Sequence, residues 1–146
     1  MGSTATQTYH SSANSGFGDG ALNDLTTGYN NSAVGFSALG KTTTGFYNAG
    51  YGTSALYSNV SGDRNTAVGS YPLYWMTTGD NNTAIGYYSL QGNHSGSLNT
   101  AIGYNSGRFI AGALSSNTTP YISVMENTSF LINLVRLCPS IHSVTM

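Results

Sequence analysis

The sequence has little charge, a single cysteine and no long apolar run. Its 146 residues include four Lys plus Arg and five Asp plus Glu, for a formal net charge of −1. A chain without a basic face cannot neutralise many phosphates, so nucleic acid is not an expected partner. Cys138 is the only cysteine, which excludes an intramolecular disulfide and a cysteine-based zinc site.

Neither a membrane span nor a secretion signal is expected. No apolar run approaches the roughly 20 residues that cross a bilayer. Residues 1–20 lack the basic start and the apolar run of a signal peptide. A location outside the cell would therefore require another route of delivery, or a longer natural chain of which this is a fragment.

What the sequence does have is a repeat with a fixed period of 17 residues. Residues 82–90 read NTAIGYYSL, and related stretches begin 17 residues earlier at Asn65 and 17 residues later at Asn99. Fixed-period similarity of this kind is typical of repeat architectures. Position one of the repeat is asparagine and position five is glycine, at Asn14, Asn31, Asn48, Asn65, Asn82 and Asn99 and at Gly18, Gly35, Gly52, Gly69, Gly86 and Gly103.

The repeat predicts an all-β fold, a parallel β-solenoid of six 17-residue coils. Seventeen residues are too few for the helix pairs of common α-solenoids, which need roughly 33. Thr, Val, Ile and Tyr between paired glycines favour short strands, and each glycine can supply the positive φ of a corner. We expect residues 1–13 to be a leader or partial coil, 14–112 the repeat region, and 113–146 an atypical C-terminal cap or tail.

Each coil is expected to turn two apolar side chains inward, one at position four and a leucine at position nine. Position four holds Phe17, Val34, Tyr51, Val68, Ile85 and Ile102, and position nine holds Leu22, Leu39, Leu56, Leu73 and Leu90. Burial of so few apolar side chains offsets only part of the roughly 1–2 kcal/mol of backbone entropy that each residue loses on folding. We therefore predict burial against other copies of the chain, in a homotrimer.

The stacked asparagines at position one have two interpretations, both structural. They can form a side-chain amide ladder like those of cross-β stacks. Alternatively, asparagine is chosen there only as a turn-former.

The C-terminal end breaks the pattern. Residues 130–138 form the one strongly apolar run, and Gly112 is the last glycine. This run can be a strand or short helix that caps the solenoid. It can also be a trimerisation segment, or a foreign end produced by truncation or a reading-frame change.

The six copies resemble the NTAIGYxAL…TTG repeats of phage tail-fibre and tail-spike proteins. They resemble, more distantly, the repeats in the heads of trimeric autotransporter adhesins. The resemblance covers residues 14–112 and implies an elongated, trimeric β-roll on a virion or bacterial surface that contacts host receptors or matrix. It carries no catalytic residues. The period of 17 exceeds that of the adhesin heads, and the tail from Tyr121 matches neither family.

Catalysis, metal binding and cofactors are not expected. His10, His94 and His142 stand in three unrelated contexts. Asp63 and Asp80 share position sixteen of adjacent coils, where a carboxylate pair can bind a cation or transfer a proton. Arg64 offers the simpler explanation of local charge balance.

Two binding surfaces are possible. Aromatic residues at positions six, seven, ten and eleven predict a platform for a glycan or protein receptor, made of Tyr57, Tyr71, Tyr74, Trp75, Tyr87, Tyr88 and Tyr104. The same rings can instead be buried between subunits. Thr66, Thr83 and Thr100 form a hydroxyl row of the kind that orders water in ice-binding solenoids, although Ala49 interrupts it. The remaining alternative is a passive, self-assembling shaft without a ligand.

Overall fold

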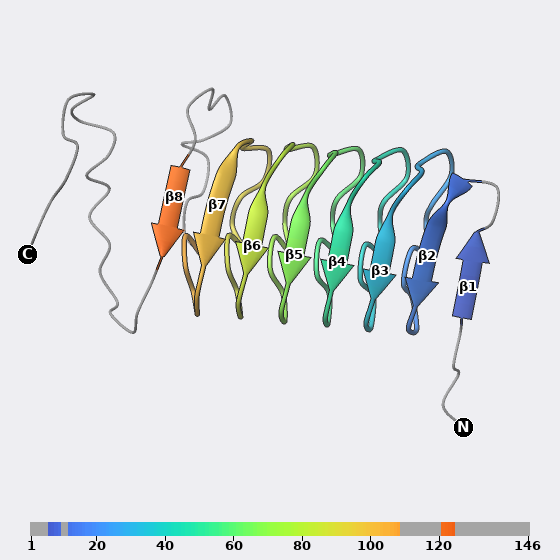
Figure 1. Cartoon of the computed structure of the whole chain (residues 1–146), viewed down its shortest axis with the longest axis horizontal. Coiled ribbons are helices and arrows are strands. Elements are labelled where there is room, and N and C mark those ends of the chain that lie inside the picture. The colour runs from blue at the N-terminus through green and yellow to red at the C-terminus, as the bar shows by residue number, and fades with distance from the viewer. Residues whose placement is uncertain (1–5, 10–11, 109–120, 125–146) are drawn as a thin grey trace, which may run out of the picture.

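The computed structural model describes residues 6–9, 12–108 and 121–124. The strands within these ranges form one eight-stranded sheet, in which they follow one another in chain order. Figure 1 shows the strands side by side along a rod, with the rest of each coil behind them. The strands are β1 Thr6–Tyr9, β2 Asn14–Phe17, β3 Ser32–Val34, β4 Ala49–Tyr51, β5 Thr66–Val68, β6 Thr83–Ile85, β7 Asn99–Ile102 and β8 Tyr121–Val124.

The strands from β2 to β7 are parallel, and each pairs with the next at an offset of one repeat. Thr83, for example, lies opposite Thr66 on one side and Thr100 on the other. Backbone hydrogen bonds also join neighbouring coils outside the strands, as where the Leu39 N–H donates to the Ala55 carbonyl over 2.9 Å. The predicted all-β parallel solenoid is therefore confirmed.

Both ends of the rod carry an additional strand. β1 pairs with β2 in the antiparallel direction and lies within the expected leader. β8 pairs in parallel with β7, so Tyr121–Val124 extends the sheet at the C-terminal end. The apolar run 130–138, which we expected to cap the solenoid, and residues 109–112 of the expected repeat region lie outside the described residues.

The prediction that position four points inward is wrong. In each three-residue strand the middle residue is buried, whereas the residue at position four is exposed. Neighbouring side chains of a strand point to opposite faces, and the thin interior accepts only the small residue at position three, which is glycine or alanine. The exposed side chains, here named the position-four row, are Phe17 (59%), Val34 (43%), Tyr51 (42%), Val68 (37%), Ile85 (39%) and Ile102 (42%).

Leucine at position nine does point inward, as predicted, and forms the centre of the core. All five of these leucines are fully buried and pack with alanines of positions three and eight and with Met76. Each leucine has a φ between 49° and 56°. This left-handed conformation costs a non-glycine residue roughly 1–2 kcal/mol. Burial of the side chain offsets that cost, since it contributes roughly 1.5–3 kcal/mol.

The two glycines of each repeat have different roles. At position five φ lies between 119° and 131°, as predicted for a corner. At position fifteen no left-handed φ occurs, so the prediction is wrong for this second set. Gly45 instead allows close approach, because a Cβ there would lie 2.6 Å from the Gly62 carbonyl oxygen and 3.1 Å from the Asn48 Nδ2.

We expect replacement of Thr42 with valine to stabilise the solenoid by about 1 kcal/mol. The Thr42 side chain is fully buried and its hydroxyl has no hydrogen-bond partner. The equivalent slot accepts the apolar side chain of Met76 in another coil. Thr43→Val is the matched control, because the Thr43 hydroxyl donates to the Val60 carbonyl over 3.1 Å. Urea denaturation followed by circular dichroism should give T42V a higher urea midpoint than the parent chain, and T43V a midpoint equal to that of the parent or lower. Equal midpoints for T42V and the parent chain would contradict the prediction.

Candidate binding surface

The asparagines of position one form a continuous amide ladder through the interior. Each side-chain Nδ2 donates to the Oδ1 of the asparagine one coil earlier, over 2.9–3.1 Å. Each of these Oδ1 atoms also accepts the backbone N–H of the asparagine one coil later, over 2.8–3.0 Å. The ladder, the first of our two interpretations, is therefore present, and it uses the buried amides for folding.

The ladder also explains the second glycine of the repeat. The Nδ2 of Asn48 donates to the Gly62 carbonyl over 2.7 Å, and that of Asn65 donates to the Gly79 carbonyl over 2.8 Å. The coil must come close to itself for this bond to form, and glycine at position fifteen leaves the necessary space. Position one and position fifteen are thus one structural unit.

The aromatic residues predicted as a platform do lie together, on the part of the coil that follows the strand. Tyr87 and Tyr104 stack with ring centres 5.6 Å apart, and Tyr87 contacts Tyr88 at 4.1 Å. Tyr88 contacts Tyr71 at 5.5 Å, which joins this group to the preceding coil. The rings follow one another because positions six and seven of successive coils are one coil spacing apart.

A second set of contacts extends the group across positions seven, ten and eleven. Tyr71 lies 5.6 Å from Tyr74, which stacks on Tyr57 at 5.2 Å and meets Trp75 edge-on at 4.6 Å. All seven predicted residues are therefore connected. We name this group the aromatic cluster: Tyr57, Tyr71, Tyr74, Trp75, Tyr87, Tyr88 and Tyr104.

The cluster combines exposed rings with half-buried ones that support them. Trp75, Tyr87 and Tyr104 are 49%, 40% and 64% exposed. Tyr71, Tyr74 and Tyr88 are half-buried beside them. The guanidinium of Arg108 lies over the Tyr88 ring, with its Cζ 4.2 Å from the ring centre, and its Nε donates to Gln91 over 3.0 Å. The Nζ of Lys41 lies 5.3 Å from the ring centre of Tyr57, so two edges of the cluster carry a positive charge.

The phenol groups at the centre of the cluster hold their protons firmly. A side-chain hydrogen bond with Tyr88 is the main cause that raises the pKa of Tyr87. Burial is the main cause that raises the pKa of Tyr74. Both pKa values therefore move up from an ordinary value near 10. At neutral pH these side chains are uncharged and can donate hydrogen bonds.

Two tyrosines of the cluster have an unfavourable backbone conformation. Position seven is left-handed in every coil, with φ of 59° at Tyr71 and 55° at Tyr88. The same position holds Gly20, Ser37, Ser54 and Asn105 in the other coils, and of these residue types glycine and asparagine adopt this conformation with little strain. For a bulky residue such as tyrosine, the left-handed conformation is unfavourable. Strain of this kind is frequently found at functional sites.

A second aromatic group was not predicted from the sequence. Phe46 stacks on Tyr29 at 4.9 Å, and Tyr47 meets both rings edge-on. The guanidinium of Arg64 lies 5.5 Å from the Phe46 ring centre. The signal was present in the sequence, because aromatic residues occupy positions sixteen and seventeen of adjacent repeats.

The carboxylates at position sixteen bind backbone rather than each other. Asp63 Oδ1 accepts the Phe46 N–H over 3.0 Å, and Asp80 Oδ1 accepts the Asp63 N–H over 2.8 Å. Partial burial, opposed by the bond from Phe46 and reinforced by the charge of Asp80, raises the pKa of Asp63. These side chains therefore have a structural role, which was not predicted from the sequence. The described residues contain no group of three His, Cys, Asp or Glu side chains that could hold a metal ion.

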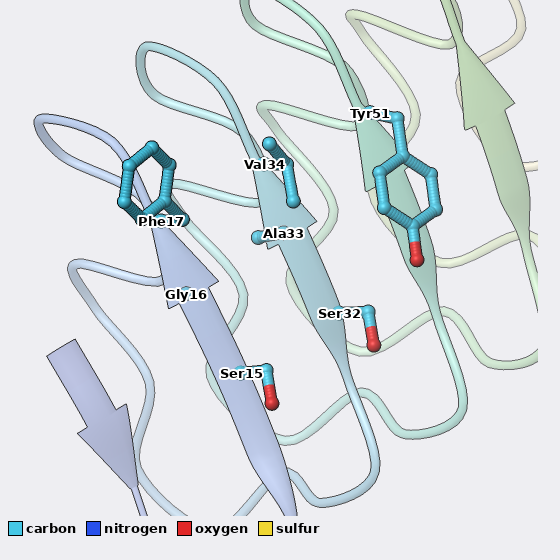
Figure 2. A pocket seen from close by; sticks show the side chains of 7 residues that line it. All are labelled: Ser15, Gly16, Phe17, Ser32, Ala33, Val34 and Tyr51. Atoms are coloured by element: carbon cyan, nitrogen blue, oxygen red, sulfur yellow. The ribbon is translucent and has the colours of Figure 1, made fainter. Parts of the chain in front are cut away.

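The hydroxyl row at position two shares the strand face with the position-four row. Thr66, Thr83 and Thr100 are half-buried, and Ala49 interrupts the row. A shallow hollow of about 260 Å³ lies at the N-terminal end of this face. Figure 2 shows Phe17, Val34 and Tyr51 along one side of the hollow and Ser15 and Ser32 along the other.

Comparison with protein-family models, with curated proteins and with solved structures finds no match to this chain. Within the described ranges, no helix has the length and apolar character needed to cross a membrane.

Proposed function

We propose that the chain is a non-enzymatic fibre module that attaches to a host or matrix surface through its aromatic cluster. The observation that carries the proposal is the chain of seven contacting rings, three of them exposed, on a scaffold of stacked coils. Aromatic faces supply large apolar contacts, and their polar ends supply hydrogen bonds. Such residues dominate the energetics of many interfaces.

The backbone conformation of position seven also supports this proposal. The left-handed backbone at Tyr71 and Tyr88 costs stability, relative to the glycine or asparagine that other coils have at this position. The leucines of position nine have the same conformation and are fully buried, whereas the rings of Tyr71 and Tyr88 are only half-buried. Contacts of these two rings with a ligand would offset the rest of the cost.

A glycan is the ligand class that this surface fits best. Neutral phenols and an indole ring can stack on the apolar face of a sugar, while the phenol O–H groups donate to its hydroxyls. Rigid rings lose little conformational entropy on binding, since each has two χ angles. The proposed location, on a virion tail fibre or a cell surface, rests on the resemblance of the repeats.

A glycan array probed with the purified chain tests the proposal. We expect binding to at least one glycan, and at least a tenfold loss of affinity for it in Trp75→Ala. Tyr29→Ala is the matched control, because Tyr29 is an exposed ring outside the cluster, and it should bind like the parent chain. Tyr71→Asn should weaken binding without lowering the melting temperature. Binding to no glycan, or equal loss in the Trp75 and Tyr29 variants, would contradict the proposal.

A passive self-assembling filament is the second candidate, and the exposed position-four row favours it. Six exposed aliphatic and aromatic side chains stand in a line on one face, and contiguous patches of this kind often mark interaction sites. This row lies on the strands, whereas the aromatic cluster lies on the following part of the coil. Assembly and attachment can therefore coexist in one fibre module.

A further inference from the structure

We propose that the strand face is a self-association site, on which a second copy of the chain packs with its rod reversed. The face consists of the position-four row and the hydroxyl row, which run side by side across β2 to β7. The inference concerns a different surface from the aromatic cluster and does not depend on a glycan ligand.

The charge distribution of the face suits a second copy. Neither row contains an Asp, Glu, Lys or Arg side chain, because position two holds Ser, Thr or Ala and position four holds Phe, Tyr, Val or Ile. Two such faces can meet without burying an unpaired charge. A charged partner would gain nothing from this face. A copy of the same face is complementary to it.

The exposed area is also of the right size. An aromatic side chain has roughly 150–250 Å² of surface and Val and Ile have less, so two aromatic and four aliphatic side chains that are 37–59% exposed offer on the order of 450 Å² in total. A standard interface buries about 800 Å² per partner, and slightly more than half of that area is apolar. The position-four row thus supplies the apolar share of such an interface. The hydroxyl row and the rim supply its polar share.

Side-chain sizes along the row favour reversed rods. A two-fold axis parallel to the strands, between β4 and β5, lays one position-four row on the other with its order inverted. Phe17 then faces Ile102 of the second copy, Val34 faces Ile85, and Tyr51 faces Val68. None of these pairs brings two aromatic rings together. If the rods instead ran in the same direction, each residue of the row would face the same residue of the second copy. Phe17 would then face Phe17 and Tyr51 would face Tyr51, with two small Val34 side chains between these ring pairs.

The hollow at the N-terminal end fits the same arrangement. It lies on the strand face, with Phe17, Val34 and Tyr51 along one side and the small Ser15 and Ser32 along the other (Figure 2). In the reversed pair, the branched side chains of Ile85 and Ile102 from the second copy stand over this hollow and fill it. Each copy fills the hollow of the other, as an isologous interface requires.

Cysteine crosslinking tests the inference on chains in which Cys138 is replaced by serine. A bismaleimide with a spacer of about 8 Å should crosslink Val34→Cys/Ile85→Cys into dimers, whereas each single variant should stay uncrosslinked. Within one chain the two positions are three coils, or about 14 Å, apart, so the spacer does not join them. Circular dichroism verifies that all variants keep the parent fold.

Two results would overturn the inference. Crosslinked dimers from Val34→Cys alone would show that equal levels meet, as in a trimer with parallel rods. A folded double variant that stays uncrosslinked at concentrations where the parent chain associates would show that the strand face is not the contact.

Discussion

Replacement of Gly52 with alanine should lower the free energy of unfolding by at least about 3 kcal/mol. Gly52 has a φ of 126°, far outside the range of L-residues. A Cβ there would also collide with the backbone of the next coil, 2.7 Å from the Gly69 carbonyl carbon. Neither problem can be relieved by a side-chain rotation. The coils would have to separate, which would strain the 2.8 Å bond that the Gly69 N–H donates to the Tyr51 carbonyl.

Gly50→Ala is the control, two residues away in the same coil. A Cβ at Gly50 would lie 3.2 Å from the Ala55 carbonyl oxygen and 3.3 Å from Leu39 Cγ, which is tight but open to adjustment. Alanine occupies this position in other coils, as at Ala33 and Ala67. Urea denaturation should therefore show a loss within about 1 kcal/mol for G50A. Similar losses in both variants would mean that the corner glycine has no special conformational role.

Replacement of Asn65 with leucine should have a comparable or larger effect. The Asn65 amide is fully buried, donates to the Gly79 carbonyl and to Asn48 Oδ1, and accepts from Asn82. Leucine has a similar size but leaves these groups without partners in the interior. Each unsatisfied buried group costs about 1–3 kcal/mol, and the break would divide the ladder in its middle. We expect N65L not to fold at 25 °C by circular dichroism.

Aspartate at the same position makes the effect dependent on pH. A buried carboxyl in place of the Asn65 amide should have a folded-state pKa above its unfolded value of about 3.9. The protonated form favours the fold, so N65D should be most stable below pH 4 and lose stability as pH rises. Asn23→Ala, at an exposed asparagine, is the control and should behave like the parent chain. If the stability of N65D did not change with pH, the conclusion that the asparagine ladder is buried would be contradicted.

Periodicity alone predicted most of the fold. A 17-residue repeat with a constant glycine permits little besides stacked coils, and the observed register of Thr66, Thr83 and Thr100 follows from it. It did not predict which side of each strand faces the core. A strand of three residues shows too little alternation for this decision, and a shift of one residue exchanges the two faces. Position four was therefore placed inside, although the buried residue is the small one before it.

The aromatic cluster was predictable in its membership but only partly in its geometry. Stacking at one position of successive coils, as between Tyr87 and Tyr104, follows from the repeat. The contact between Tyr71 and Tyr74 depends on how the coil bends after the strand, and the left-handed residues that set this bend include tyrosine and leucine. Residue propensities do not predict a left-handed conformation for such side chains.

The most direct test of a fibre module that associates through its strand face is the solution mass of the chain. Light scattering on the eluting peak should give a particle near twice 15.2 kDa, and circular dichroism of the same peak should show β structure. A particle of three times that chain mass would replace the reversed pair with the trimer expected from the sequence. A folded particle of 15.2 kDa at every concentration would contradict self-association and leave the position-four row without a role in assembly.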